Sequence, residues 1–214
     1  MLLTLSQNNK EPSSNIRVRR RDAATTENAI LKAAEKLFSR NGFEGVSTKQ
    51  LAIEAGVAIG TLYHHYPSKE DIYSATTKRA FAKKANLPKK IINSQESPER
   101  HLVQLTAWFV RSVILDKKFG QLMKREMLDP RPSTPNLLDE NLFQQPVRLF
   151  KELIIKIYPH ADVDEATASM LALIFGFSSL KGIYSLFPSI RETLLTPEEI
   201  AEHATSLLLR GLHH

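Results

Sequence analysis

Apolar side chains spaced for a helix run through almost the whole chain, and this spacing restricts it to an all-α fold. From Thr25 onward they recur three or four residues apart, as at Ile30, Ala34 and Leu37, so that each segment has one apolar face. No segment shows the alternation of apolar and polar residues that a half-buried strand requires. The prolines at positions 98, 130, 132, 135, 159, 188 and 197 fall between the helical segments or in their first turns, where a helix tolerates them.

Four helices are predicted near the N-terminal end, with their limits marked by caps. Gly42 suits a left-handed cap at the end of the first helix. Ser47 opens the second, and Gln50 three residues on completes a capping box. The third spans about residues 59–65, and Ser68 opens the fourth by the same pattern. Longer amphipathic helices follow, predicted at residues 98–116, 118–128, 139–158, 164–187 and 197–211.

The excess of positive charge lies entirely in the N-terminal part of the chain. Residues 1–84 hold 14 lysines and arginines against 8 aspartates and glutamates, whereas residues 85–214 hold 15 of each. A basic module joined to a neutral one indicates that the first part meets a polyanion, although a basic surface is also compatible with no specific partner. Residues 1–22, with the run RVRRRD, are predicted to form a flexible basic arm that contacts phosphates or a minor groove. A solvated tail would have the same composition.

The absence of cysteine and of long apolar runs excludes several classes of site. The chain has no cysteine, and therefore no disulfide, thiolate metal ligand or cysteine nucleophile. Its most apolar run, residues 170–177, is too short to span a bilayer. The start, MLLTLSQNNK, lacks the basic segment of a signal peptide. We therefore expect a cytoplasmic protein that does not bind membranes.

A pair of short helices around Gly56 carries the clearest motif. Leu51 and Leu62 are spaced so that the two helices pack at a steep angle, and Ala52 is small where they would cross. Gly56 lies in the turn, where a positive φ would strain a residue with a β-carbon. Tyr66 is predicted to pack against the first helix. This is the pattern of a helix-turn-helix; taken alone, it also fits an ordinary corner between two helices.

The surrounding sequence makes the motif more specific. Residues 29–76 resemble the TetR family of bacterial transcriptional repressors in the elements NGFEGVSTKQLA, AGVAIGTLYHHY and SKEDI, which occur in the right order. The resemblance implies an N-terminal three-helix helix-turn-helix DNA-binding domain, placed at residues 23–70, and a C-terminal helical bundle, residues 71–214, for ligand binding and dimerisation. It implies a ligand-responsive regulator, a repressor that a small molecule releases from a near-palindromic operator. An activator, or a regulator without a ligand, is the alternative.

The third predicted helix would present its outer face to DNA. If Leu62 points inward, the residues that point outward are those at positions 58, 59, 60, 63 and 64. Tyr63 offers a ring for thymine methyls or sugar and a hydroxyl for phosphate, and His64 can donate to a base edge or a phosphate. Thr61 and His65 flank them as phosphate contacts. The alternatives are a core aromatic for Tyr63 and a structural histidine for His65.

The resemblance assigns further DNA contacts, and the sequence departs from the family at one of them. Ser47 and Thr48 match the phosphate-binding start of the second helix, Lys49 a position that reaches a base edge, and Lys69 a lysine that grips phosphate. Ala58 stands where the family commonly has a hydroxyl, so direct readout is predicted to be sparse. The predicted DNA-binding residues are Ser47, Thr48, Lys49, Ile59, Gly60, Thr61, Tyr63, His64, His65 and Lys69.

The C-terminal part is implied to dimerise and to bind an effector. By the resemblance, a homodimer forms through the last two long helices, about 164–187 and 197–211, where small residues at 176, 178, 179 and 182 would admit a partner helix. The same residues also fit a monomer core. The lack of a charge cluster favours a small apolar or aromatic effector, surrounded by side chains that are otherwise plain core. The candidates are Trp108, Phe109, Met123, Met127, Phe143 and Phe175.

The residues favour no enzyme, cofactor or metal site. GFSSL at 176–180 lacks the last glycine of a nucleophile elbow, and the sequence holds no HExxH, phosphate-binding loop or dinucleotide fingerprint. His64 and His65 are adjacent, so they point about 100° apart on a helix and chelate a metal poorly. A protein that binds a membrane surface would share the basic charge, but it would not need the capped short helices. We therefore predict double-stranded DNA as the partner.

Overall fold

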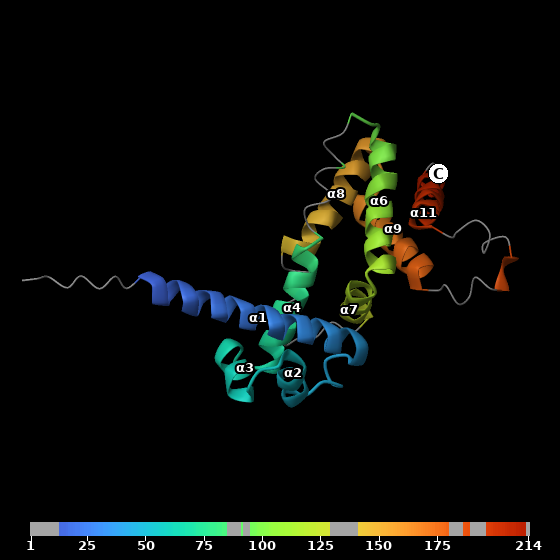
Figure 1. Cartoon of the computed structure of the whole chain (residues 1–214). Coiled ribbons are helices and arrows are strands. Elements are labelled where there is room, and N and C mark those ends of the chain that lie inside the picture. The colour runs from blue at the N-terminus through green and yellow to red at the C-terminus, as the bar shows by residue number, and fades with distance from the viewer. Residues whose placement is uncertain are drawn as a thin grey trace, which may run out of the picture.

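The computed structural model describes residues 13–84, 91, 95–128, 141–179, 186–188 and 196–212. None of these residues lies in a strand, and the regular elements that they form are helices, which confirms the all-α prediction (Figure 1). None of the helices formed by this part of the chain combines the length and the apolar character needed to cross a bilayer. The helices are α1 (Ser13–Asn41), α2 (Thr48–Ala55), α3 (Ile59–His65), α4 (Lys69–Ala82), α6 (Pro98–Leu115), α7 (Lys117–Leu128), α8 (Asn141–Ile157), α9 (Val163–Ser179) and α11 (Pro197–Gly211).

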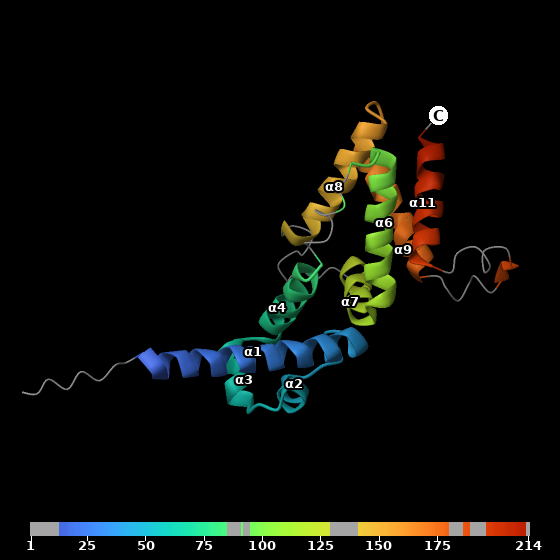
Figure 2. The ribbon, with the colours of Figure 1, turned by 45° about the horizontal axis from the view of Figure 1, so that its top comes forward.

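Helices α1 to α4 share a core at the N-terminal end. α2 and α3 lie on one side of α1, and α4 leaves the other side toward the bundle (Figures 1 and 2). Phe38 of α1, Leu51 of α2 and Leu62 of α3 are fully buried. The ring of Phe38 meets that of Tyr73 on α4 edge to face, with 5.0 Å between centroids, an arrangement that aromatic pairs prefer. These contacts fix α3 relative to the other three helices.

Helix α6 is the centre of the C-terminal bundle. It packs against α7, α8, α9 and α11, because most of its residues between His101 and Val113 are buried. In Figure 1 the bundle lies above α1, and α11 packs against α6 and α9. Burial of each large apolar side chain contributes about 1.5–3 kcal/mol to the free energy of folding. Helix α6 therefore contributes much of the stability of the bundle.

Two side chains of α7 fasten the bundle to the N-terminal unit. The buried Tyr73 hydroxyl of α4 donates a hydrogen bond to the carboxylate of Glu126. Next to it, Arg125 donates to the carbonyl of Arg40 at the end of α1, over 3.2 Å. Gly42 follows with a φ of 72°, as its predicted cap requires, and a β-carbon there would stand 2.6 Å from the Arg125 guanidinium. The end of α1 is therefore packed closely against α7.

Asp116 holds the corner between α6 and α7. Its carboxylate accepts a hydrogen bond from the backbone N–H of Phe119 at 3.1 Å and pairs with Lys84, just beyond α4, at 3.0 Å. Burial alone would raise the pKa of Asp116, but the hydrogen bond from Phe119 and the charge of Lys84 outweigh it and hold the pKa below its usual value. This corner is thus a third link between the N-terminal unit and the bundle.

Two of the predicted domain limits fall inside helices. Residues 13–22 belong to α1 and not to a flexible arm, because this stretch has no glycine or proline and is rich in arginine, a good helix former. Residues 1–12 lie outside the described residues. The predicted boundary between residues 70 and 71 falls inside α4, which runs without a break from the N-terminal unit toward the bundle.

The predicted helix over residues 164–187 is too long. α9 ends at Ser179, and neither Leu186 nor Phe187 is in an α-helix. Phe187 precedes a proline, and proline disfavours the helical conformation of the residue before it. Residues 180–185, which include Gly182, lie outside the described residues. The limits of α11 agree with the prediction of 197–211.

Candidate nucleic-acid interface

A tight turn at Gly56 sets α3 across α2. Gly56 has a φ of 68°, in the left-handed region that the sequence predicts for it. Its N–H donates to the carbonyl of Ile53 at 3.1 Å, and the N–H of Val57 donates to the carbonyl of Ala52 at 3.0 Å. These bonds occupy the last carbonyls of α2 in the manner of a glycine cap. The chain therefore leaves α2 and enters α3 within three residues.

The inner face of α3 is anchored in the N-terminal core. Leu62 is fully buried. Tyr66, which follows the helix and is half-buried, donates its hydroxyl to Glu27 of α1 at 3.1 Å, so it packs against the first helix as predicted. Burial, together with the hydrogen bond to Glu27 and its charge, raises the pKa of Tyr66. The phenol therefore stays protonated and keeps donating to Glu27.

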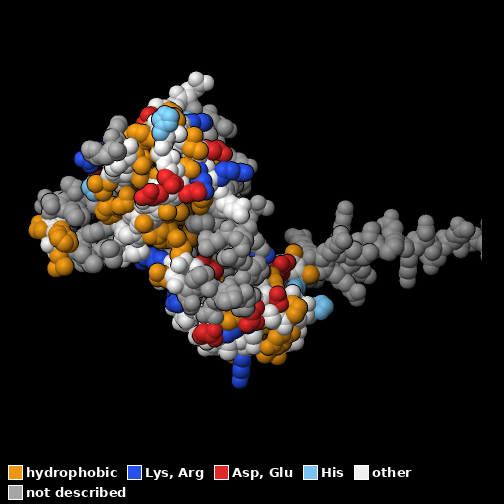
Figure 3. Space-filling model, turned by 180° about the vertical axis from the view of Figure 1, so that it is seen from behind, with side chains coloured by type: hydrophobic (Ala, Val, Ile, Leu, Met, Phe, Trp, Pro, Cys, Tyr) orange, Lys and Arg blue, Asp and Glu red, His pale blue; other side chains and the backbone are white. Residues whose placement is uncertain are grey.

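The outer face of α3 is open to solvent, as predicted. Ile59 is 47% exposed and Tyr63 46%, and Gly60 and His64 are exposed beside them. Figure 3 shows hydrophobic and histidine side chains side by side on the lower lobe, which the N-terminal helices form. The hydroxyl of Tyr63 lies 3.1 Å from that of Thr48 on α2. This bond ties the outer edge of α3 to the start of α2.

The residues that flank this face are partly covered. Thr61 and His65 are half-buried, and the rings of His64 and His65 are 5.8 Å apart at 80° to each other. Among the described residues there is no group of three side chains placed to hold a metal ion. Ala58 stands before α3 and makes no side-chain cap, since its methyl group cannot accept a hydrogen bond.

The start of α2 places three predicted contacts at the surface. The hydroxyl of Ser47 accepts from the N–H of Gln50 at 3.2 Å, and the N–H of Ser47 donates to the Gln50 side chain at 2.8 Å, which confirms the capping box. The hydroxyl of Thr48 is hydrogen-bonded to that of Tyr63. Lys49 is exposed and forms no hydrogen bond or ion pair with the other residues that the structure describes, so its ammonium points into solvent.

Lys69 has a partner that the sequence did not predict. Its ammonium donates to the carbonyl of Phe43 at 3.2 Å and lies 4.0 Å above the centre of the Phe43 ring, which is cation–π distance. Lys69 thereby fastens the loop between α1 and α2 to the start of α4. An ammonium has three N–H donors, so a phosphate contact is compatible with this bond and stays a prediction.

Solved bacterial regulators share the fold over most of the chain. FadR of Bacillus subtilis, solved with stearoyl-CoA, superposes with a TM-score of 0.69 over 84% of this chain and 96% of its own, at 15% identity. NalD of Pseudomonas aeruginosa, the secondary repressor of the MexAB-OprM multidrug efflux pump, gives 0.64 over 88% and 97%, at 24% identity. At identities this low, the superpositions establish a common fold and no more. This fold has an N-terminal helix-turn-helix and a C-terminal helical domain.

The helix-turn-helix segment decides the family. Residues 30–76 match the sequence profile of the bacterial regulatory proteins of the tetR family. The chain belongs to the TetR family. The HTH-type transcriptional regulator UidR of Escherichia coli K12 is 43% identical over 54 residues. That match spans 25% of this chain and 28% of UidR, so the likeness in sequence is confined to about a quarter of each protein.

Three of the six predicted effector residues meet in the core of this TetR-family chain. The buried ring of Phe109 on α6 lies 5.8 Å from that of Phe175 on α9 and 6.0 Å from that of Trp108. The other three are Met123, which is buried, Met127, which is half-buried, and Phe143 on α8, whose side chain lies outside the described residues. Their role in binding an effector stays a prediction.

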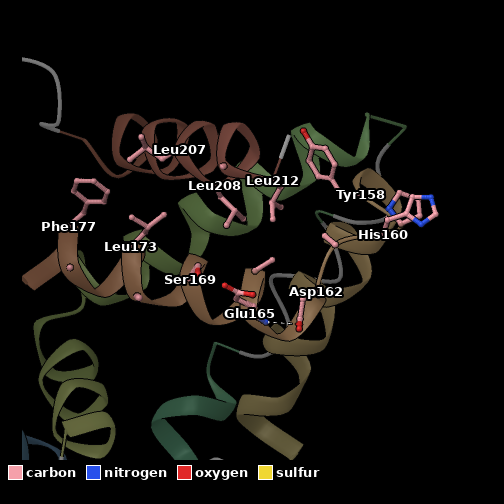
Figure 4. A pocket seen from close by; sticks show the side chains of 16 residues that line it. Tyr158, His160, Asp162, Glu165, Ser169, Leu173, Phe177, Leu207, Leu208 and Leu212 are labelled. Atoms are coloured by element: carbon pink, nitrogen blue, oxygen red, sulfur yellow. Dashed lines mark hydrogen bonds between the residues drawn. The ribbon is translucent and has the colours of Figure 1, made fainter. Parts of the chain in front are cut away.

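A groove of about 1230 Å³ lies elsewhere, between α9 and α11. Figure 4 shows Leu173 and Phe177 pointing from α9 toward α11, and Leu208 and Leu212 pointing back. None of the six predicted effector residues is among those that line it. We did not predict this groove, because the sequence alone does not show how the two helices lie against each other. The signal that points to it is the apolar character of outward positions such as Leu207, which is 38% exposed.

Small residues form one strip of the groove wall. Ser169, Ala172 and Gly176 line it at helical spacing, and a β-carbon at Gly176 would meet no atom within 4 Å. Another helix can therefore come close at this strip. Ser178, which we predicted to face a partner, is instead buried within its own chain, because it lies on the opposite side of α9 from the strip.

Proposed function

We propose that this protein is a DNA-binding transcriptional regulator that reads duplex DNA with α3. The proposal is carried by the exposed outer face of a short helix whose inner face is fixed by Leu62 and Tyr66. A helix presented in this way can enter a major groove. The positive balance of residues 1–84 suits a polyanion, and UidR is itself an HTH-type transcriptional regulator. Such a protein acts where the DNA is, so we place it in the cytoplasm.

The regulator is proposed to be a homodimer that pairs through α9 and α11. The groove between these helices supports the proposal, since it is lined mainly by apolar side chains yet open to solvent, and its strip of small residues admits a close helix. A twofold axis there would present two copies of α3 to successive major grooves, about 34–36 Å apart. The operator should accordingly be near-palindromic.

The finer proposal is a repressor that a small apolar or aromatic molecule releases from DNA. Two proteins of the same fold support it: NalD is a repressor, and FadR of Bacillus subtilis holds stearoyl-CoA. Binding near Phe109 and Phe175 would favour a form whose two reading helices no longer match successive grooves. An activator, or a regulator without an effector, is the alternative. Titration of the DNA complex with stearoyl-CoA and with small aromatic compounds tests release.

DNA binding is tested by fluorescence anisotropy with the full chain across a salt series. The probes are the DNA upstream of the protein's own gene and a random duplex of equal length. We expect selective binding that the double variant Tyr63→Ala, His64→Ala loses. Lys49→Ala, at a position predicted to reach a base edge, should reduce the preference for the upstream DNA over the random duplex. Lys118→Ala, which alters an exposed lysine of α7, should leave that preference unchanged. Failure to bind any duplex at low salt would refute the proposal.

The dimer is tested by sedimentation of two matched leucine variants. Leu207→Glu places a charge in the groove between α9 and α11 and should yield monomers, because a carboxylate buried in an apolar interface is strongly disfavoured. Leu128→Glu changes a leucine of α7 that is 86% exposed and should leave dimers intact. Dimers that survive Leu207→Glu would place the interface elsewhere.

A further inference from the structure

Ile59 is a large apolar side chain that its own chain leaves uncovered. It is the first residue of α3 and is 47% exposed. Tyr63 follows four residues later on the same face of the helix and is nearly as exposed. The two side chains therefore form an apolar stripe along the part of α3 that points away from the protein core.

The position next to Ile59 leaves room for DNA to approach this side chain closely. Gly60 has no side chain, and a β-carbon there would meet no atom within 4 Å. The Tyr63 hydroxyl is bonded to Thr48 of α2, which holds the ring beside this opening. A surface as flat as a row of base edges could thus reach the isoleucine without meeting another side chain first.

The chemistry of Ile59 restricts which base it can recognise. In the major groove, thymine alone of the four bases shows a methyl group, while the other edges there show hydrogen-bond donors and acceptors. An isoleucine set against a donor or acceptor would displace water from that group and offer no hydrogen bond in return. Against a methyl group, the same side chain loses exposed apolar surface at no such cost.

Resting on the proposed function, we infer that Ile59, flanked by the ring of Tyr63, is a specificity-determining residue that reads the 5-methyl group of a thymine in each operator half-site. The remaining outward residues at the start of α3, Ala58 and Gly60, have no side chain that can hydrogen-bond to a base. The isoleucine thus carries the sequence information at this end of the helix.

The test replaces thymine by deoxyuridine, which lacks only the methyl group. Duplexes are first selected from a random pool with the full-length protein, and each thymine of the selected site is then replaced in both half-sites. Loss of one methyl contact corresponds to about a fourfold weaker affinity, so the symmetric replacement should weaken binding about fifteenfold at one thymine position. The Ile59→Ala protein should bind the thymine and uracil duplexes equally well.

Two further variants isolate the methyl contact from a general loss of binding. Ile59→Val keeps a branched apolar side chain and should keep most of the sensitivity to uracil. Ile53→Ala removes an equally large side chain that is 70% exposed on α2 and should keep all of it. A selected site that shows no uracil effect at any position, or an undiminished effect with Ile59→Ala, would overturn this inference while leaving DNA binding intact. Failure to enrich any sequence would overturn both.

Discussion

Replacing Gly42 by alanine should weaken the contact between the DNA-reading unit and the bundle. At its φ of 72°, an alanine costs about 1 kcal/mol relative to glycine. The new β-carbon would stand 2.6 Å from a nitrogen of the Arg125 guanidinium, which is flexible and would swing away. Arg125 would then lose its hydrogen bond to the carbonyl of Arg40, worth about 0.5–1 kcal/mol at the surface. We expect Gly42→Ala to lower the free energy of unfolding by about 2 kcal/mol in total.

Gly56 provides the matched control for this change. Its φ of 68° is nearly the same, but a β-carbon there would meet no atom within 4 Å, so Gly56→Ala should cost only about 1 kcal/mol. Urea unfolding followed by circular dichroism measures both, alone and combined with Arg125→Ala. The excess cost of Gly42→Ala should disappear once Arg125 is truncated. Equal costs for the two glycine variants, or an excess that persists without the Arg125 side chain, would refute the proposed contact.

Three other changes test the local architecture by denaturant unfolding. Leu62→Ala should cost about 2–5 kcal/mol because it leaves a cavity in the core, while Ile53→Ala at the surface should stay within about 0.5 kcal/mol; similar costs would contradict the assigned burial. Ser47→Ala should cost about 1 kcal/mol by removing the cap of α2, and no loss would mean that the cap is dispensable. Asp116 has a folded pKa below its usual value of 3.8, so its pairing with Lys84 stabilises the fold above that pH and the stabilisation is lost as the pH falls through the folded pKa. The stability gap between the wild type and Asp116→Asn should therefore shrink on acidification from pH 7 to below 3.8, and a gap that grows would reverse the assigned sign.

The features predicted correctly from the sequence are those that depend on near neighbours. The Ser47–Gln50 capping box, the turn at Gly56 and the limits of α3 follow from residues within four positions of one another. The inward side of α3 followed as well, because one buried leucine sets the direction of every other side chain on a short helix.

The features that the sequence did not predict depend on segments brought together by the fold. Lys69 binds the carbonyl of Phe43, 26 positions away, and nothing in the residues near either one indicates the pairing. The groove between α9 and α11 needs two helices placed side by side before its apolar positions can be recognised as one surface. The arginine-rich start of α1 was misjudged for another reason: charge density was taken as a sign of disorder, although arginine itself favours helix.

The hydrogen bond between Thr48 and Tyr63 also affects the free energy of DNA binding. A side chain that is free in solution and fixed in a complex costs about 0.5–1.5 kcal/mol on binding, and Tyr63 is already held in the unbound protein. The entropic cost of fixing the Tyr63 side chain therefore falls on folding and not on DNA binding. This would strengthen association with any duplex by about two- to tenfold. Thr48 need not contact a base for this effect. Thr48→Val would then weaken binding to matched and mismatched sites alike. The affinity would fall, whereas the ratio of the affinities for the two kinds of site would stay the same.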